Sequence, residues 1–133
     1  MPSERIETVR RFLKAIEQHD SKAIRLCLGP GYTSNDKAVG KTSRTREELA
    51  REGEEFRAWS DLQYEVEAIF ETTDGAVVAQ LVKSGTLTGP FRSLTGSGQH
   101  VRYSFCDIFR FDDAGRIVQE DWYYDLLSIK AQL

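Results

Sequence analysis

The chain has 133 residues and a formal net charge of −3, from 18 basic and 21 acidic side chains. This length is typical of one domain of about 100–150 residues, and we expect a single domain over residues 1–133. The mild acidic excess argues against nucleic-acid binding, and the sequence shows no signal peptide and no apolar run of the roughly 18 residues that a membrane span needs, so we expect a cytoplasmic protein.

The N-terminal residues predict two helices. Apolar side chains recur at steps of three and four residues from Ile6 to Ile16, and Ser3 is a suitable N-cap before them. Asp20 is a suitable N-cap for a second helix, which we expect to stop at residues 29–31, Gly-Pro-Gly.

The next segment is polar over residues 32–41, and we expect it to be irregular. Thr45 and Glu48 have the spacing of a capping box, which predicts a third helix that continues through Phe56 and Trp59.

Beyond residue 61 the apolar period changes from that of a helix to two, the period of a β-strand. The pattern predicts four strands and a last short helix, at residues 62–70, 76–88, 99–111, 116–124 and 126–133. Apolar residues of the first strand alternate along one face as far as Phe70. Helices followed by antiparallel strands indicate an α+β fold in which the sheet curls around the helices.

Two glycine-containing stretches, GTLTGPF at residues 85–91 and SGQHV at residues 97–101, resemble the signature of the SnoaL-like polyketide and ester cyclases. The C-terminal half, with Asp125 near its end, is also similar to that family. The resemblance implies the cone-shaped fold of nuclear transport factor 2, limonene-epoxide hydrolase and ketosteroid isomerase. In that fold, a curved antiparallel sheet and the N-terminal helices enclose a deep, mostly apolar pocket.

Asp107 is the leading candidate for a catalytic acid–base. It alternates with aromatic residues on one face of the third strand, and burial in an apolar pocket raises the pKa of a carboxyl group. The alternative is a structural role, in which Asp107 accepts hydrogen bonds at the rim of the sheet.

Glu120 is a second candidate. The family resemblance places an essential aspartate at the position of Trp122, and Asp121 next to it points to the other face of the sheet. Glu120 would then substitute for that aspartate from the same face as Trp122. The alternative is that Trp122 fills the cavity and Glu120 is a solvated charge at the rim.

Further residues are candidates for substrate binding. Lys83 would pair with a pocket carboxylate and lower its pKa, or would be exposed at the strand end. Asn35 and Asp36 would offer polar groups at the pocket mouth, or would form a turn. The remaining candidates are aromatic residues of the predicted strands, which would form walls or donate a hydrogen bond to a developing enolate: Tyr64, Tyr103, Phe105, Trp122 and Tyr124.

These residues suggest a pocket for a hydrophobic small molecule, and the leading hypothesis is a cyclase or isomerase that transfers a proton on a carbonyl compound. The chemistry would need no cofactor, and His19 and His100 have no ligand-like neighbours for a metal. The alternatives are a non-catalytic ligand-binding domain and an interaction module. The family resemblance also implies a homodimer across the outer face of the sheet, against the alternative of a partly apolar monomer surface.

Overall fold

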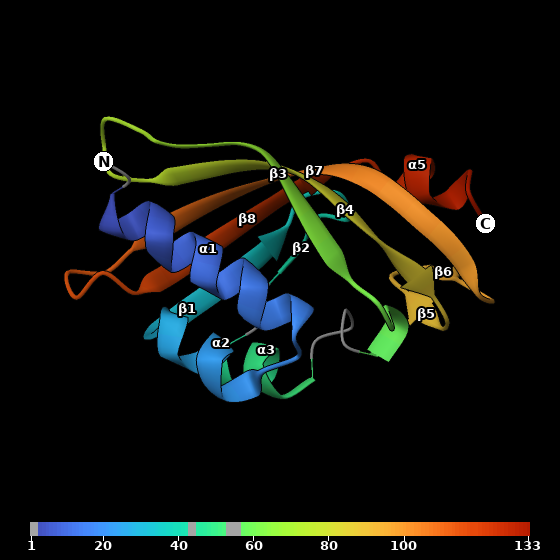
Figure 1. The fold of residues 1–133 in the computed structure, drawn as a ribbon, viewed down its shortest axis with the longest axis horizontal. Coiled ribbons are helices and arrows are strands. Elements are labelled where there is room, and N and C mark those ends of the chain that lie inside the picture. The colour runs from blue at the N-terminus through green and yellow to red at the C-terminus, as the bar shows by residue number, and fades with distance from the viewer. Residues whose placement is uncertain (1–2, 43–44, 53–56) are drawn as a thin grey trace.

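The computed structural model describes residues 3–42, 45–52 and 57–133. In this part of the chain, helices at the N-terminus lie against one face of a curved sheet (Figure 1). The helices are α1 (Glu4–Glu17), α2 (Ser21–Cys27), α3 (Arg46–Glu52) and α5 (Leu126–Lys130). The strands are β1 (Leu28–Asp36), β2 (Lys41–Thr42), β3 (Gln63–Glu71), β4 (Val77–Leu87), β5 (Pro90–Phe91), β6 (Leu94–Thr95), β7 (Gln99–Phe111) and β8 (Ile117–Tyr124).

The described strands form a six-stranded sheet in the order β2-β1-β8-β7-β4-β3, and a separate hairpin of β5 and β6. Neighbouring strands of the large sheet are antiparallel except β1 and β8, which run parallel. The predicted α+β fold, with N-terminal helices and a curved, mainly antiparallel sheet, is therefore confirmed.

The predicted helix starts are also confirmed. The side chain of Ser3 accepts a hydrogen bond from the Ile6 backbone N–H, and Asp20 caps α2 in the same way. Thr45 and Glu48 form the reciprocal pair of a capping box, at 3.1 and 3.2 Å. Phe56, expected in the third helix, lies outside the described residues, and Trp59, expected there too, forms a β-bridge with Leu87 instead.

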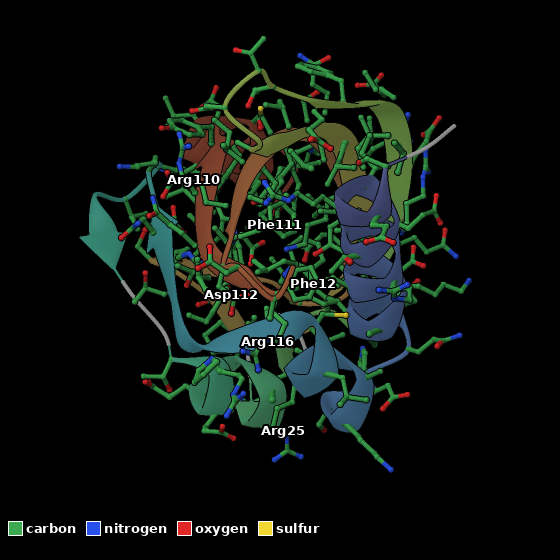
Figure 2. All side chains as sticks on the ribbon, turned by 90° about the vertical axis from the view of Figure 1, so that its left-hand side faces the viewer. Phe12, Arg25, Arg110, Phe111, Asp112 and Arg116 are labelled. Atoms are coloured by element: carbon green, nitrogen blue, oxygen red, sulfur yellow. The ribbon has the colours of Figure 1, made fainter. Side chains whose placement is uncertain are left out.

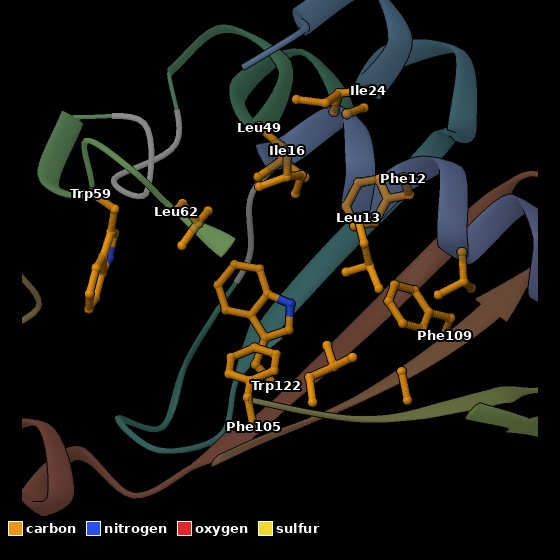
Figure 3. Close-up of a cluster of buried hydrophobic side chains, with 14 of the residues drawn as sticks. Phe12, Leu13, Ile16, Ile24, Leu49, Trp59, Leu62, Phe105, Phe109 and Trp122 are labelled. Atoms are coloured by element: carbon orange, nitrogen blue, oxygen red, sulfur yellow. The ribbon is translucent and has the colours of Figure 1, made fainter. Parts of the chain in front are cut away.

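Helix α1 closes the core over the concave face of the sheet, which is the face turned toward α1. The ring of Phe12 packs edge-on against Phe109 of β7, with 5.9 Å between the ring centroids. Figure 2 looks along this space, with Phe12 and Phe111 between α1 and the strands. Figure 3 shows Trp122 and Phe105 further along the same apolar cluster.

The prediction that the segment after the second helix is irregular is wrong as far as Asp36. Strand β1 begins directly after α2 and continues to Asp36. A register shift between Leu28 and Thr33 accommodates Pro30, which has no N–H to donate to a neighbouring strand. No apolar alternation marks this strand because the buried side chains near its end, Ser34 and Asp36, are polar.

The one-sided pattern expected for the first predicted strand, which is β3, fails in its second half. Val66 lies opposite Leu81 whereas Ala68 lies opposite Gln80, so Glu67 is an extra residue that forms a β-bulge. A bulge exchanges the two faces of the strand beyond it. Phe70, expected on the inner face, is therefore 46% exposed.

Candidate functional site

The registers of the sheet place the inward side chains in rows across the strands. Asp107 lies opposite Trp122, and Phe109 lies opposite Glu120 in the next row. Because residues two apart share a face of a strand, the carboxyl groups of Asp107 and Glu120 are diagonal neighbours on the concave face.

Both carboxyl groups are removed from solvent. Asp107 is 2% exposed and Glu120 is 3% exposed. The alternative reading of Glu120 as a solvated rim charge is therefore wrong. An ionised carboxylate buried without compensation is unstable, so two of them in adjacent rows require a shared proton or strong hydrogen bonds.

Tyr32 supplies one of those hydrogen bonds from the neighbouring strand β1. Its hydroxyl donates to Glu120 Oε1 over 2.6 Å. Burial, followed by the negative charge of Glu120, raises the pKa of Tyr32 well above its ordinary value, so this hydroxyl keeps its proton. Tyr32 therefore acts as a hydrogen-bond donor to Glu120.

Asp107, the other carboxyl group of the pair, has a different environment. Burial, together with the charge of Glu120 and a hydrogen bond to it, raises the pKa of Asp107 well above 3.8. Its Oδ1 atom is buried and has no hydrogen-bond partner in the described part of the chain. The two carboxyl groups thus differ in environment, and the raised pKa favours Asp107 as a protonated member of the pair.

Aromatic side chains flank this pair. The rings of Phe105 and Tyr124 stack, with 5.6 Å between centroids and 16° between planes, and Phe105 also contacts Trp122 at 6.3 Å. Phe105 and Trp122 were predicted as pocket walls and Tyr124 as a hydrogen-bond donor, and the sheet places the three side by side.

The hydroxyl of Tyr124 is engaged elsewhere. It donates to Asp36 Oδ2 over 2.7 Å, and Arg92 Nε donates to the same carboxylate over 2.5 Å and to the Tyr124 hydroxyl over 3.1 Å. Asp36 therefore lies inside, as part of an ion pair with Arg92. Tyr124 has no second proton to offer to an enolate.

Lys83 is 2% exposed, so the alternative of an exposed lysine is wrong. Its ammonium lies 5.3–5.7 Å from the centroids of four aromatic rings, those of Trp59, Phe91, Tyr103 and Phe105. Desolvated contacts of this kind contribute about 2 kcal/mol and offset part of the cost of burying a charge. The pKa of Asp107 is raised, whereas an ion pair with Lys83 would lower it.

Two candidates lie away from the carboxyl pair. Asn35 is on the opposite face of the sheet, where its amide donates to Asp121 Oδ1 over 2.9 Å. Tyr64 is half-buried at the end of the sheet near Lys83, directly opposite it across β3 and β4.

Tyr32, Arg92 and Trp59 were not predicted as site residues from the sequence. Tyr32 and Arg92 come from segments predicted as irregular, where no periodicity indicates which side chains point inward. Arg92 also has a left-handed backbone with φ of 57°, which local sequence does not reveal for an arginine.

No group of three or more metal-ligating side chains occurs among residues 3–42, 45–52 and 57–133. No helix in the same ranges is long and apolar enough to cross a membrane. A hollow of about 880 Å³ between α1, α2 and the β7–β8 turn is lined by charged side chains, including Arg5 and Arg116, and does not include the carboxyl pair.

Comparison with known families identifies the fold and its relatives. The family model of the SnoaL-like polyketide cyclases matches residues 7–133. The chain belongs to this family. A search of curated protein sequences finds no match.

Solved structures of SnoaL-like proteins and their neighbours share the fold. A protein of Jannaschia sp. CCS1 described as a SnoaL-like polyketide cyclase superposes with a TM-score of 0.82 at 24% identity, over 99% of this chain and 95% of that one. An LEH-like epoxide hydrolase of M. tuberculosis gives 0.77 at 19% identity, over 98% and 89%. A ketosteroid isomerase-like protein of Catenulispora acidiphila, in complex with trimethylamine, gives 0.76 at 19%, over 95% and 91%.

Proposed function

We propose that this SnoaL-like protein transfers a proton at the carbon next to the carbonyl group of a hydrophobic ketone. The observation that carries this proposal is the buried pair of Asp107 and Glu120, in which the pKa of Asp107 is raised and Tyr32 donates a hydrogen bond to Glu120. A protonated acid beside a charged base at neutral pH is the arrangement that enolisation requires.

In the proposed step, the Glu120 carboxylate takes a proton from the α-carbon. The electrons of that C–H bond form the carbon–carbon double bond of the enol, and the carbonyl oxygen receives the proton of Asp107. Asp107 is then ionised and Glu120 protonated, and the reverse transfers restore both groups. The enol carbon is the nucleophile for a ring closure, or is protonated again for an isomerisation.

The aromatic side chains would bind the rest of the substrate. Phe105 and Trp122 lie beside the carboxyl pair and present ring surfaces to a flat, apolar molecule. Their exclusion of water would also strengthen the interaction of Asp107 with the developing negative charge on the carbonyl oxygen.

The test is the exchange of α-protons of hydrophobic ketones, including β-tetralone, in deuterated water, followed by nuclear magnetic resonance. We expect the wild-type protein to accelerate exchange, and Asp107→Asn and Glu120→Gln each to lose about a hundredfold or more of the acceleration. Asp121→Asn is the matched control, because Asp121 is next to Glu120 and bonds to Asn35 on the other face.

Equal rates for Asp107→Asn and Asp121→Asn would contradict the proposal. Binding of ketones with no acceleration by the wild-type protein would favour the alternative, a non-catalytic ligand-binding domain of the same fold.

A further inference from the structure

The concave face carries a second buried polar group, two rows from Asp107. Lys83 of β4 lies opposite Tyr103 of β7, and Asp107 is four residues further along β7. Four residues of a strand span roughly 13 Å. Lys83 and the carboxyl pair therefore mark two ends of one aromatic wall, with Phe105 between them.

Trp59 adds an unused hydrogen-bond donor at the Lys83 end. Its side chain is fully buried, and its indole N–H has no hydrogen-bond partner in the described ranges. The ring reaches this position because Gly85 has no side chain: a Cβ there would lie 3.1 Å from Trp59 Cε3. Buried N–H groups almost always have an acceptor, so this one indicates an acceptor that the described part of the chain does not provide.

The charge and the donor belong to one group of side chains. The Lys83 ammonium is 5.3 Å from the centroid of the Trp59 ring, and Phe91 and Tyr103 contact both residues. A buried positive charge beside an N–H donor, surrounded by aromatic faces, has the properties that bind an acidic oxygen on an apolar molecule.

We propose that Lys83 and Trp59 bind an anionic oxygen of the substrate, such as a carboxylate or phenolate, at the end opposite the reacting ketone. This inference rests on the proposed function for the position of the ketone. It narrows the substrate class to elongated, apolar molecules that carry an acidic group roughly 13 Å from the carbonyl group.

The test uses two probes of similar shape and different charge, the anion anilinonaphthalenesulfonate and the neutral phenylnaphthylamine. Their dissociation constants are measured by calorimetry and fluorescence. We expect Lys83→Met to weaken binding of the anion by about tenfold or more and to leave the neutral probe unchanged. Lys14→Met, which removes an exposed lysine of α1, is the control for net charge and should leave both constants unchanged.

Trp59→Phe keeps an aromatic ring and removes only the N–H donor and part of the indole. It should weaken binding of the anionic probe by about fivefold. If Lys83→Met does not fold, this variant alone tests the proposal. The proposal is overturned if the wild-type protein does not prefer the anion, or if either variant binds both probes as the wild type does.

Loss of binding of both probes by Trp59→Phe would also overturn the proposal, because the role of Trp59 would then be structural. None of these measurements uses turnover, so a failure here leaves the α-proton exchange test of the carboxyl pair intact. Conversely, absence of exchange with a preserved preference for the anion would contradict the proposed function and keep the anion site.

Discussion

Tyr32 donates a hydrogen bond of 2.6 Å to Glu120, although the two residues are 88 positions apart in the chain. The parallel pairing of β1 with β8 creates this contact, because it sets Ser34, two residues after Tyr32, opposite Glu120. The bond gives Glu120 a hydrogen-bond donor, whereas Asp107 Oδ1 has no partner in the described part of the chain. Tyr32 is therefore a positioning residue for the Glu120 carboxyl group.

Tyr32→Phe should separate this role from packing. Without the hydroxyl, the charged form of Glu120 loses its hydrogen bond, and the stability of the fold should fall by about 1–3 kcal/mol. The pH profile of α-proton exchange should also shift, because the hydroxyl no longer contacts Glu120, whose charge contributes to the raised pKa of Asp107. Urea unfolding and the pH profile measure the two effects. Tyr123→Phe, on the outer face, is the control, and an unchanged profile in Tyr32→Phe would exclude the role.

The sequence predicted those parts of the fold in which apolar side chains alternate regularly on the inner face of a strand. Strand β7 has the predicted bounds, and its alternation correctly placed Asp107 on the inner face. The sequence left alternatives open where burial and polarity disagree. Lys83 and Glu120 are buried next to aromatic rings and Tyr32, and these partners come from distant elements, so the sequence alone did not exclude an exposed position for either residue.

The prediction failed for β1 and for the second half of β3, because pairing with other strands determines both. Strand β1 is held by its pairing with β8, across most of the chain, and its buried side chains are polar. The bulge at Glu67 depends on the register of β3 against β4, which hydrophobic alternation does not encode. Local pattern therefore identified both carboxyl groups of the proposed site as candidates, whereas Tyr32 required the tertiary structure.

The raised pKa of Asp107 predicts a pH-dependent stability. A carboxyl group whose pKa is higher in the folded protein than the 3.8 of the unfolded chain stabilises the fold fully below pH 3.8. Its contribution decreases as the pH rises from there through the folded-state pKa, by about 1.4 kcal/mol per pH unit.

Asp107→Asn removes this titration. The free energy of unfolding of the wild type, measured in urea between pH 4 and pH 9 at fixed ionic strength, should therefore fall relative to that of the variant as the pH rises. Asp113→Asn, at the β7–β8 turn, is the control and should give a constant difference. A constant difference for Asp107→Asn as well would show that burial does not raise its pKa.

The convex face of the sheet predicts self-association, and we propose that two copies of the chain pair across it. Phe70 of β3, Tyr123 of β8 and Leu127 of α5 are large apolar residues exposed at or near this face. Sedimentation at micromolar concentration should give twice the mass of 15.1 kDa, and Tyr123→Glu should shift the protein toward monomer. Leu26→Glu, on exposed α2, should not, and a wild-type monomer would contradict the proposal.

The ion pair of Arg92 and Asp36 should stabilise the β5–β6 hairpin over the aromatic wall. Both side chains are almost fully buried, and the Arg92 guanidinium also lies 4.5 Å from the centroid of Phe91 and 5.7 Å from that of Trp122. Removing one partner of a buried ion pair leaves the other charge uncompensated. Arg92→Met should therefore lower the free energy of unfolding by about 3–5 kcal/mol.

A double-mutant cycle with Asp36→Asn measures the pair itself. The double variant should lose less than the sum of the two single losses, because neither charge is then left alone in the interior. Arg102→Met, which breaks an exposed ion pair with Glu65, is the control and should cost about 1 kcal/mol or less. If Arg92→Met lowers the free energy of unfolding in urea no more than Arg102→Met does, the buried ion pair does not stabilise the hairpin.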